Sequence, residues 1–322
     1  MKSCWSGKLR QSRTTHSNKS VSELTTTVLR TSKGAKIRKG DTLLVWYEGE
    51  LLNGTRFDAN YDFTTFSNPS PTLNYTQSEG AFLIQATPAN PFEFVVGAGT
   101  VIQGWDQAFS KGRRVGEVLE LFIPAQLGYG EAGAGDNIPP NSDLSFTVEV
   151  LGALPKGADN AVFPQLKDLG VNTKKLGLKA KSLENLNQTK VGLDGKDHLI
   201  GDNTKDLLIG LGGDDKLIGA GGADVLIGGA GKNSYVYTEI SDSSAGESGR
   251  DSIYGFGKND TINLRALDGE LSFIGSKPFS GASGDVRFKS ETLELDQDGD
   301  GSADFAIAMP GTKSLKGSNL ML

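Results

Sequence analysis

A nine-residue repeat runs through the chain from Gly192 to Val236, where it is read five times in register. Its first and fourth positions are mostly glycine, which allows the positive φ angles that a very tight turn requires. Each copy ends in a short apolar run, and stacked copies place one residue of each run in a ladder that no single copy can bury. The ladder residues are Leu199, Leu208, Leu217, Leu226 and Tyr235. The repeat therefore predicts a chain that coils around a shared apolar core.

The sixth position of the repeat carries a carboxylate in four of the five copies, at Asp197, Asp206, Asp215 and Asp224. A carboxylate beside the carbonyl oxygens of a tight turn is the ligand set that calcium prefers. Without a cation the stacked carboxylates repel one another, so we expect calcium binding and folding to be coupled. The pattern predicts Ca²⁺ as the cofactor and these four aspartates as its ligands.

The repeat resembles the calcium-binding nonapeptide G-G-x-G-x-D-x-U-x of RTX proteins. The resemblance implies a parallel β-roll in which each ion lies between copies two apart. The implied pairs are Asp197 with Asp215, Asp206 with Asp224, and a weaker Asp215 with Asn233. The copies depart from the consensus at Asp202, Thr204, Leu211, Ala220 and Asn233. The alternative, a disordered linker rich in glycine and aspartate, accounts for neither the strict period nor the recurring Leu-Ile pair.

Four ordered segments precede the repeat and carry a second pattern. They are V-W-Y-E-G-E-L-L-N-G-T-R-F-D (45–58), F-E-F-V-V-G-A-G-T-V-I-Q-G-W-D (92–106), V-G-E-V-L-E-L-F-I-P-A-Q-L-G-Y-G (115–130) and N-I-P-P-N-S-D-L-S-F-T-V-E-V (137–150). Together they resemble the FK506-binding-protein (FKBP) class of peptidyl-prolyl cis–trans isomerases. The resemblance implies an antiparallel sheet around one short helix, which we place at Asp106 to Lys111. The predicted fold class is therefore mainly β, with this α+β domain followed by a calcium-bound parallel β-roll and a β-sandwich.

The same resemblance implies an aromatic pocket that takes a proline ring. The implied catalytic residues are Tyr47, Phe57, Asp58, Trp105, Tyr129 and Phe146. The implied substrate-binding residues are Phe92, Val101, Ile102 and Ile138. Asn137 stands where the family has a second isoleucine, and we expect Phe94 and Phe122 to belong to the core instead. Prolyl peptides or proteins are the implied substrates, and macrolides are the implied ligands.

An aromatic pocket suits rotation about an Xaa-Pro amide bond. Resonance opposes this rotation with a barrier of roughly 18–20 kcal/mol, and the twisted amide is less polar than the planar one. An apolar cavity therefore favours the twisted state by desolvation, without a nucleophile or a proton transfer. A different function remains open from the sequence: an extracellular binding or adhesion protein that uses a catalytically weak isomerase fold as a scaffold.

The chain after the repeats resembles the domain that closes serralysin-type secreted metalloproteases. The resemblance rests on the segments 248–267, 273–288 and 295–307, while the H-E-x-x-H motif of the protease itself is absent from the sequence. In that family this end carries an uncleaved signal for an ABC-type exporter, so an exporter is an implied partner. Asp296, Asp298, Asp300 and Asp304 have the spacing of an EF-hand loop, but Ile307 stands where calcium needs a bidentate glutamate. This mismatch favours a structural turn over a strong calcium site.

These patterns predict the organisation of the whole chain. The expected parts are a disordered basic tail (1–20), an isomerase domain (21–155) with a long loop insertion (59–90), a linker (156–190), the RTX β-roll (191–238) and a serralysin-type C-terminal domain (239–322). The insertion either extends substrate binding or is an ordered surface excursion packed on its own aromatic residues, and we favour the second.

Charge and hydropathy narrow the partners and the location. The net charge of −6 makes nucleic acid an unexpected partner. No apolar run reaches transmembrane length, and the N-terminus lacks the apolar core of a signal peptide. Cys4 is the only cysteine, so no intramolecular disulfide can form. We therefore expect a secreted protein that is exported through its C-terminus.

Overall fold

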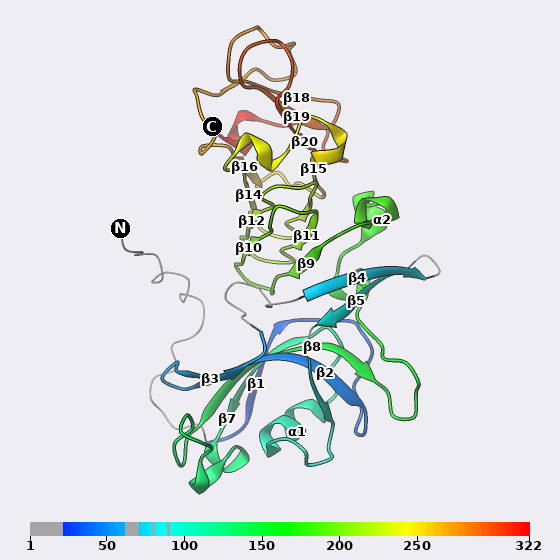
Figure 1. The fold of residues 1–322 in the computed structure, drawn as a ribbon, viewed down its shortest axis with the longest axis vertical. Coiled ribbons are helices and arrows are strands. Elements are labelled where there is room, and N and C mark those ends of the chain that lie inside the picture. Colours follow the sequence, from blue (N-terminus) through cyan, green and yellow to red (C-terminus); the bar gives the residue numbers. More distant parts are fainter. Residues whose placement is uncertain (1–21, 62–70, 79–80, 89–90) are drawn as a thin grey trace. The chain divides into compact units, whose positions relative to one another are not determined.

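The computed structural model describes residues 22–61, 71–78, 81–88 and 91–322 (Figure 1). The chain divides into two compact units. The first unit contains Met1–Pro71 and Pro88–Pro164, and the second contains Thr72–Thr87 and Gln165–Leu322. The predicted basic tail lies outside the described residues.

The first unit is an antiparallel sheet with one short helix, as predicted. Five strands follow the order β1-β7-β8-β2-β3, and β6 pairs with β2. The strands are β1 (Thr25–Arg30), β2 (Thr42–Leu51), β3 (Arg56–Ala59), β6 (Phe92–Val95), β7 (Val118–Ile123) and β8 (Leu144–Leu154). Two 3-10 turns, Ala125–Leu127 and Gly130–Ala132, connect β7 to β8.

Helix α1 spans Gln103–Phe109, so it begins three residues before the predicted start and also ends earlier. The reason is its inner face, where Trp105, Ala108 and Phe109 are buried in the core. Gly104 permits the close approach of helix and sheet, because a Cβ there would lie 2.5 Å from the side chain of Ile123. The core under the helix includes Leu43, Val45, Phe94, Leu121 and Val148.

The range 59–90, predicted as a loop insertion, contains two paired strands. They are β4 (Pro71–Ser78) and β5 (Ala81–Pro88). Both segments contain aromatic and β-branched residues, including threonine. These residues favour an extended backbone despite the serine and asparagine residues near them. Two aromatic residues of this range, Phe63 and Phe66, lie outside the described residues.

The second unit is built on two mostly parallel sheets, which confirms the predicted β-roll. One sheet contains β10 (His198–Ile200), β12 (Lys216–Ile218), β14 (Ser234–Val236), β16 (Thr261–Asn263) and β21 (Leu320–Met321). The other contains β9 (Gln188–Val191), β11 (Asp206–Ile209), β13 (Val225–Ile227), β15 (Asp251–Ile253), β20 (Phe305–Ala308), β19 (Thr292–Asp296), β18 (Asp285–Lys289) and β17 (Ser272–Phe273). Successive copies of the repeat alternate between the sheets, so strands two copies apart pair directly.

The predicted ladder is present in both sheets. Leu199 pairs with Leu217, and Leu217 pairs with Tyr235, in one sheet, while Leu208 pairs with Leu226 in the other. All five side chains are buried. This burial is shared between copies, as the period required.

The roll then skips one nine-residue copy. Leu226 pairs with Ile253, and Tyr235 pairs with Ile262, so the next strand lies three copies onward instead of two. The skipped copy, 237–245, contains no glycine and has Ser244 at its ladder position. Without the glycine turns and the apolar residue it cannot add a strand, and its chain forms the 3-10 turn Ile240–Asp242 instead.

Residues 166–190 lie in the range predicted as a linker (156–190), and in the structure they fold into short elements. They form the 3-10 turns Leu166–Leu169 and Ala180–Leu183, helix α2 (Thr173–Leu176) and strand β9. Their apolar residues pack against Leu207, Ile209, Val225 and Ile227 and so cover the first turns of the roll. These covering residues are Leu166, Leu169, Val171, Leu178 and Leu183. We call residues 166–183 the cap of the roll. The cap was not predicted from the sequence, because in short turns separated by glycines the apolar residues recur with neither a helical nor a strand period.

The C-terminal strands extend the two sheets of the roll. Strand β20 pairs in parallel with β15, and β21 pairs in parallel with β16. Strands β18, β19 and β20 are antiparallel neighbours. Within the described part of the chain, no helix has the length and apolar character that crossing a bilayer requires.

Candidate active site and calcium sites

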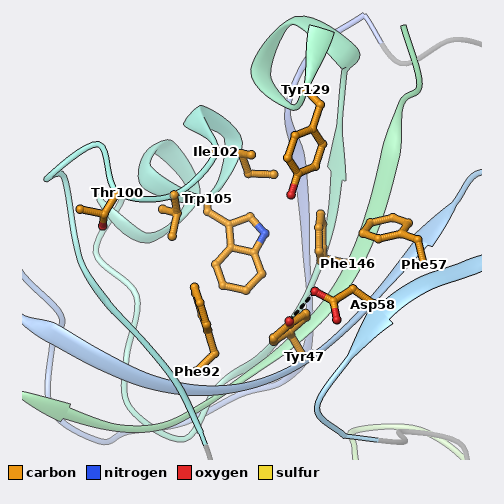
Figure 2. A pocket seen from close by; sticks show the side chains of 10 residues that line it. Tyr47, Phe57, Asp58, Phe92, Thr100, Ile102, Trp105, Tyr129 and Phe146 are labelled. Carbon is orange, nitrogen blue, oxygen red and sulfur yellow. Dashed lines mark hydrogen bonds between the residues drawn. The ribbon is translucent and has the colours of Figure 1, made fainter. Parts of the chain in front are cut away.

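The first unit contains a cavity of about 300 Å³ beside helix α1 (Figure 2). Its lining includes nine of the ten predicted catalytic and substrate-binding residues. It also includes Thr100, which was not predicted from the sequence. The nine are Tyr47, Phe57, Asp58, Phe92, Val101, Ile102, Trp105, Tyr129 and Phe146. Ile138 is buried in the core cluster and does not line the cavity, because its backbone pairs with Ala134 in the loop before β8. Phe94 and Phe122 are buried core residues, as expected.

Trp105 lies at the centre of the aromatic side chains (Figure 2). Its ring makes edge contacts with Tyr47 at 5.6 Å, Phe92 at 5.9 Å and Phe146 at 5.3 Å between centroids. Its side chain is 4 % exposed, and among the described residues its Nε1–H has no hydrogen-bond partner. Perpendicular contacts of this kind hold each ring in one orientation. The cavity therefore has a rigid aromatic floor.

Polar groups lie on one side of the cavity. The hydroxyl of Tyr47 donates a 2.6 Å hydrogen bond to Oδ2 of Asp58. Burial, and then this hydrogen bond, raise the pKa of Tyr47 above its usual value. Burial, and then the charge of Asp58, raise the pKa of Tyr129 as well. Both phenols therefore keep their protons at physiological pH and remain hydrogen-bond donors.

Two local features place the lining residues. Gly49 permits the contact of Phe57 with Phe146, because a Cβ there would lie 2.8 Å from one ring and 2.7 Å from the other. The carboxylate of Asp106 accepts hydrogen bonds from the N–H groups of Gly97 and Gly99, so it holds the loop that leads to Val101. Asp106 was not identified from the sequence as a site residue, although it ends the matched segment 92–106.

The aspartates of the repeat stack in two columns along the roll. Asp197 N–H donates to Oδ1 of Asp215 at 2.9 Å, and Asp206 N–H donates to Oδ1 of Asp224 at 2.8 Å. Asp215 N–H donates to Oδ1 of Asn233 at 3.1 Å. The three pairs implied by the sequence are therefore spatial neighbours.

Both columns continue beyond the region that the sequence indicated. Asp224 N–H donates to Oδ1 of Asp251 at 2.8 Å, and Asn233 N–H donates to Oδ1 of Asp260 at 2.9 Å. Asp251 and Asp260 were not identified from the sequence, because the skipped copy (237–245) interrupts the repeat before them. The signal was nevertheless present, since both residues keep the nine-residue spacing and each precedes an isoleucine by two positions.

Within the part of the chain that the structure describes, the columns contain buried carboxylate oxygens without a hydrogen-bond partner. These atoms are Oδ1 of Asp206 and Oδ2 of Asp215 and Asp224. Burial raises the pKa of Asp206 to about 6 and that of Asp215 to about 7. Burial, and then the charge of Asp251, raise the pKa of Asp224 further, and burial, with the charges of Asp242 and Asp206, raises the pKa of Asp251. Buried carboxylates without partners are costly unless a cation neutralises them, so these residues fit calcium.

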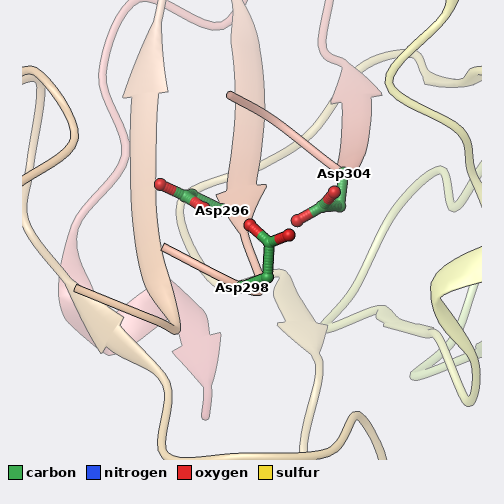
Figure 3. A group of neighbouring side chains, drawn as sticks. All are labelled: Asp296, Asp298 and Asp304. Atoms are coloured by element: carbon green, nitrogen blue, oxygen red, sulfur yellow. The ribbon is translucent and has the colours of Figure 1, made fainter. Parts of the chain in front are cut away.

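A third acidic group lies at the end of β19 and in the turn that leads to β20 (Figure 3). Carboxylate oxygens of Asp296, Asp298 and Asp304 lie within 4.8 Å of one another. Asp296 accepts hydrogen bonds from the N–H groups of Gly299 and Gly301, and Asp304 accepts one from Gln297 N–H. These bonds hold a turn between β19 and β20.

Two family models match the chain. The model "FKBP-type peptidyl-prolyl cis-trans isomerase" matches residues 33–151, and the model "Peptidase M10 serralysin C terminal" matches residues 182–321. The first match contains every residue that lines the cavity, and the second contains both aspartate columns.

Individual relatives match the first of these regions. "FK506-binding protein 2" of Dictyostelium discoideum is 43 % identical over 117 residues, which are 36 % of this chain and 68 % of that protein. "Peptidyl-prolyl cis-trans isomerase FKBP15-2" of Arabidopsis thaliana is 38 % identical over 120 residues, which are 37 % of this chain and 58 % of that protein. The crystal structure of AtFKBP13 is 29 % identical with a TM-score of 0.31, and the match covers 41 % of this chain and 94 % of that one. The chain therefore belongs to the FKBP-type peptidyl-prolyl cis–trans isomerases and carries a serralysin-type domain at its C-terminal end.

Proposed function

We propose that the first unit accelerates rotation about Xaa-Pro bonds by taking the proline ring into the aromatic cavity. The observation that carries this proposal is the enclosed set of rings around Trp105, in a cavity of about 300 Å³. A planar amide has charge separation that water stabilises, and the twisted amide loses it. An apolar cavity therefore stabilises the twisted state relative to the planar one, against a barrier of roughly 18–20 kcal/mol.

The polar groups of the site orient the bound peptide. The hydroxyl of Tyr129 and the N–H of Ile102 would donate to the carbonyl oxygens that flank the proline. The Tyr47–Asp58 pair fixes the Tyr47 ring against Trp105, so the two rings form one wall of the cavity. No step in this scheme requires a nucleophile, and the protein contributes shape, desolvation and hydrogen-bond donors.

An isomerisation assay with a proline tetrapeptide tests this function. The full chain should shorten the cis–trans relaxation, and a macrolide ligand of FKBP proteins should abolish the effect. A relaxation rate equal to the uncatalysed rate would show that the fold serves only as a binding scaffold.

We further propose that the second unit is an RTX module that folds on calcium. The residues that would hold the ions are Asp197, Asp206, Asp215, Asp224, Asp251 and Asp260, with Asn233 as a weaker position. Calcium would supply positive charge to buried carboxylates, several of which have one oxygen without a hydrogen-bond partner among the described residues. Binding free energy then becomes folding free energy, which grows with free calcium as RT ln(1 + [L]/Kd).

Coupled folding of this kind suits export from the C-terminus. At low calcium the roll would stay unfolded and could pass through a narrow ABC-type exporter, and at high external calcium it would fold. The match to a serralysin C-terminal domain supports this route. The test is co-expression with a serralysin-type exporter, with and without the residues after Gly269. Equal amounts of both forms in the medium would contradict export through this end.

A further inference from the structure

Strand β2 carries Tyr47, and two different strands pair along one edge of β2. Strand β6 pairs with Thr42 to Val45, and strand β3 pairs with Glu48 to Glu50. Between these two partners, Trp46 and Tyr47 have no paired strand on this edge of β2 within the described residues. The main chain of β3 reaches only as far as the hydrogen bond from Asn60 N–H to the Tyr47 carbonyl, at 3.0 Å.

The side chain of Asn60 occupies this gap. Its Oδ1 accepts a hydrogen bond from Tyr47 N–H at 2.7 Å, and its Nδ2 donates one to the Val45 carbonyl at 3.2 Å. One amide side chain thus supplies both the acceptor and the donor that a continuing strand would have supplied. An amide is suited to this role, because a serine hydroxyl is shorter and a carboxylate has no donor.

The gap lies beside the polar pair of the cavity. Tyr47 is the residue whose backbone Asn60 holds, and Asp58, its hydroxyl partner, lies two residues before Asn60 on the same strand end. A shift of β2 against β3 at this point would change the distance between the Tyr47 hydroxyl and the Asp58 carboxylate.

We propose that Asn60 is a positioning residue of the isomerase site, which sets the Tyr47–Asp58 pair through its two hydrogen bonds to the backbone of β2. The inference deepens the proposed isomerase function and rests on it. Asn60 does not line the cavity, so it acts through Tyr47 and not on the substrate.

The fold offers independent support for the chain at this point, so a variant at Asn60 can fold. The next residue, Tyr61, stacks on Trp46 with 4.3 Å between ring centroids and 7° between ring planes, and both side chains are buried. This stack holds the end of β3 whether or not the Asn60 amide is present. Removal of the amide therefore loosens the local geometry of Tyr47 while β3 stays in place.

The test compares Asn60→Ala with Asn53→Ala. Asn53 lies in the turn between β2 and β3, and its side chain makes one backbone hydrogen bond, to Thr55 N–H at 2.9 Å, away from the cavity. We expect Asn60→Ala to lower kcat/KM for a proline tetrapeptide about tenfold, because small displacements of positioning groups reduce turnover by such factors. We expect Asn53→Ala to leave turnover near the wild-type value, with a similar melting temperature.

A double-mutant cycle separates positioning from a general loss of structure. In a Tyr47→Phe background the hydroxyl is gone, so Asn60→Ala should lower kcat/KM by less than about twofold further. Wild-type turnover in Asn60→Ala, or two effects that simply multiply, would overturn the proposal.

If the wild-type chain shows no turnover, the proposed function fails and the positioning role is decided by hydrogen exchange. The Tyr47 amide should exchange faster in Asn60→Ala than in wild type or Asn53→Ala, because its acceptor is gone. An unchanged exchange rate would overturn the positioning role in that case as well.

Discussion

The main-chain N–H of Asp224 donates a 2.8 Å hydrogen bond to the carboxylate of Asp251, which lies 27 residues further along the chain. The carboxylate of Asp224 in turn accepts a hydrogen bond from the main-chain N–H of Asp206, 18 residues earlier. Each aspartate thus uses one oxygen to join two turns of the roll, while the other oxygen of Asp224 is buried without a partner among the described residues. The change from 18 to 27 residues marks the copy that the roll leaves out.

Asp251 should matter for calcium-dependent folding as much as the aspartates of the recognisable repeats. Asp251→Asn removes one negative charge from the column and should weaken the calcium-induced gain in β circular dichroism. The control is Asp268→Asn, at an exposed position outside the columns. Equal calcium midpoints for Asp251→Asn and the control would contradict a ligand role for Asp251.

The calcium-free roll should be more stable in acid than at neutral pH. Burial raises the pKa of Asp206 to about 6 and that of Asp215 to about 7, both above the unfolded value of about 4. A group with a raised folded-state pKa stabilises the fold below its unfolded pKa, and this stability is lost as pH rises through the folded pKa. In a chelator, the circular dichroism of the roll should therefore persist near pH 4 and decline between about pH 4 and 7.

Tryptophan fluorescence provides the control for this pH series. All three tryptophans precede residue 106, so their signal does not report on the roll. A roll that is equally folded at pH 4 and pH 8 in chelator, while tryptophan fluorescence is constant, would contradict this interpretation of the buried carboxylates.

Ala220→Gly should stabilise the roll. Ala220 has a φ of +63° at the second position of its copy, where the repeat consensus has glycine. A non-glycine residue in this conformation costs about 1–2 kcal/mol, of which the extra entropy of unfolded glycine offsets about half. Ala230 follows Gly229 in the next copy and has no positive φ, so Ala230→Gly should destabilise slightly. Thermal melting in saturating calcium measures both, and a lower melting temperature for Ala220→Gly would be the contrary result.

Trp105→Leu should reduce isomerase turnover far more than Phe109→Leu does. Both side chains are buried in the same core cluster and their rings lie 5.8 Å apart, but only Trp105 lines the cavity. The two variants should lose comparable stability, while Trp105→Leu should lose at least about tenfold in kcat/KM because the floor of the cavity is gone. Equal turnover in the two stable variants would mean that the cavity is not the active site.

Much of this architecture was predictable from local sequence patterns. The nine-residue period identified the roll, because every copy repeats the same turn and the same buried position. The aromatic residues around Trp105 were identifiable because they lie inside four ordered segments that resemble one family. Their grouping in one cavity also requires Gly49 and Gly104, which allow close packing at single points.

The features that were not predicted depend on contacts between distant parts of the chain, which no local sequence pattern indicates. The cap formed by Leu166 to Leu183 is irregular in sequence, and its leucines are buried only because the first turns of the roll need a cover. Asp251 and Asp260 join the columns because the intervening copy leaves the roll. Asn60 is an ordinary polar residue in sequence, and its role follows from the gap between two strands that meet the same edge.

The most direct test of the central claim is the cis–trans relaxation of a proline tetrapeptide with the purified full chain in calcium. The account predicts catalysis that a macrolide ligand blocks, that Trp105→Leu largely removes and that Phe109→Leu retains. A relaxation rate in the presence of the wild-type chain equal to that of the peptide alone would contradict it.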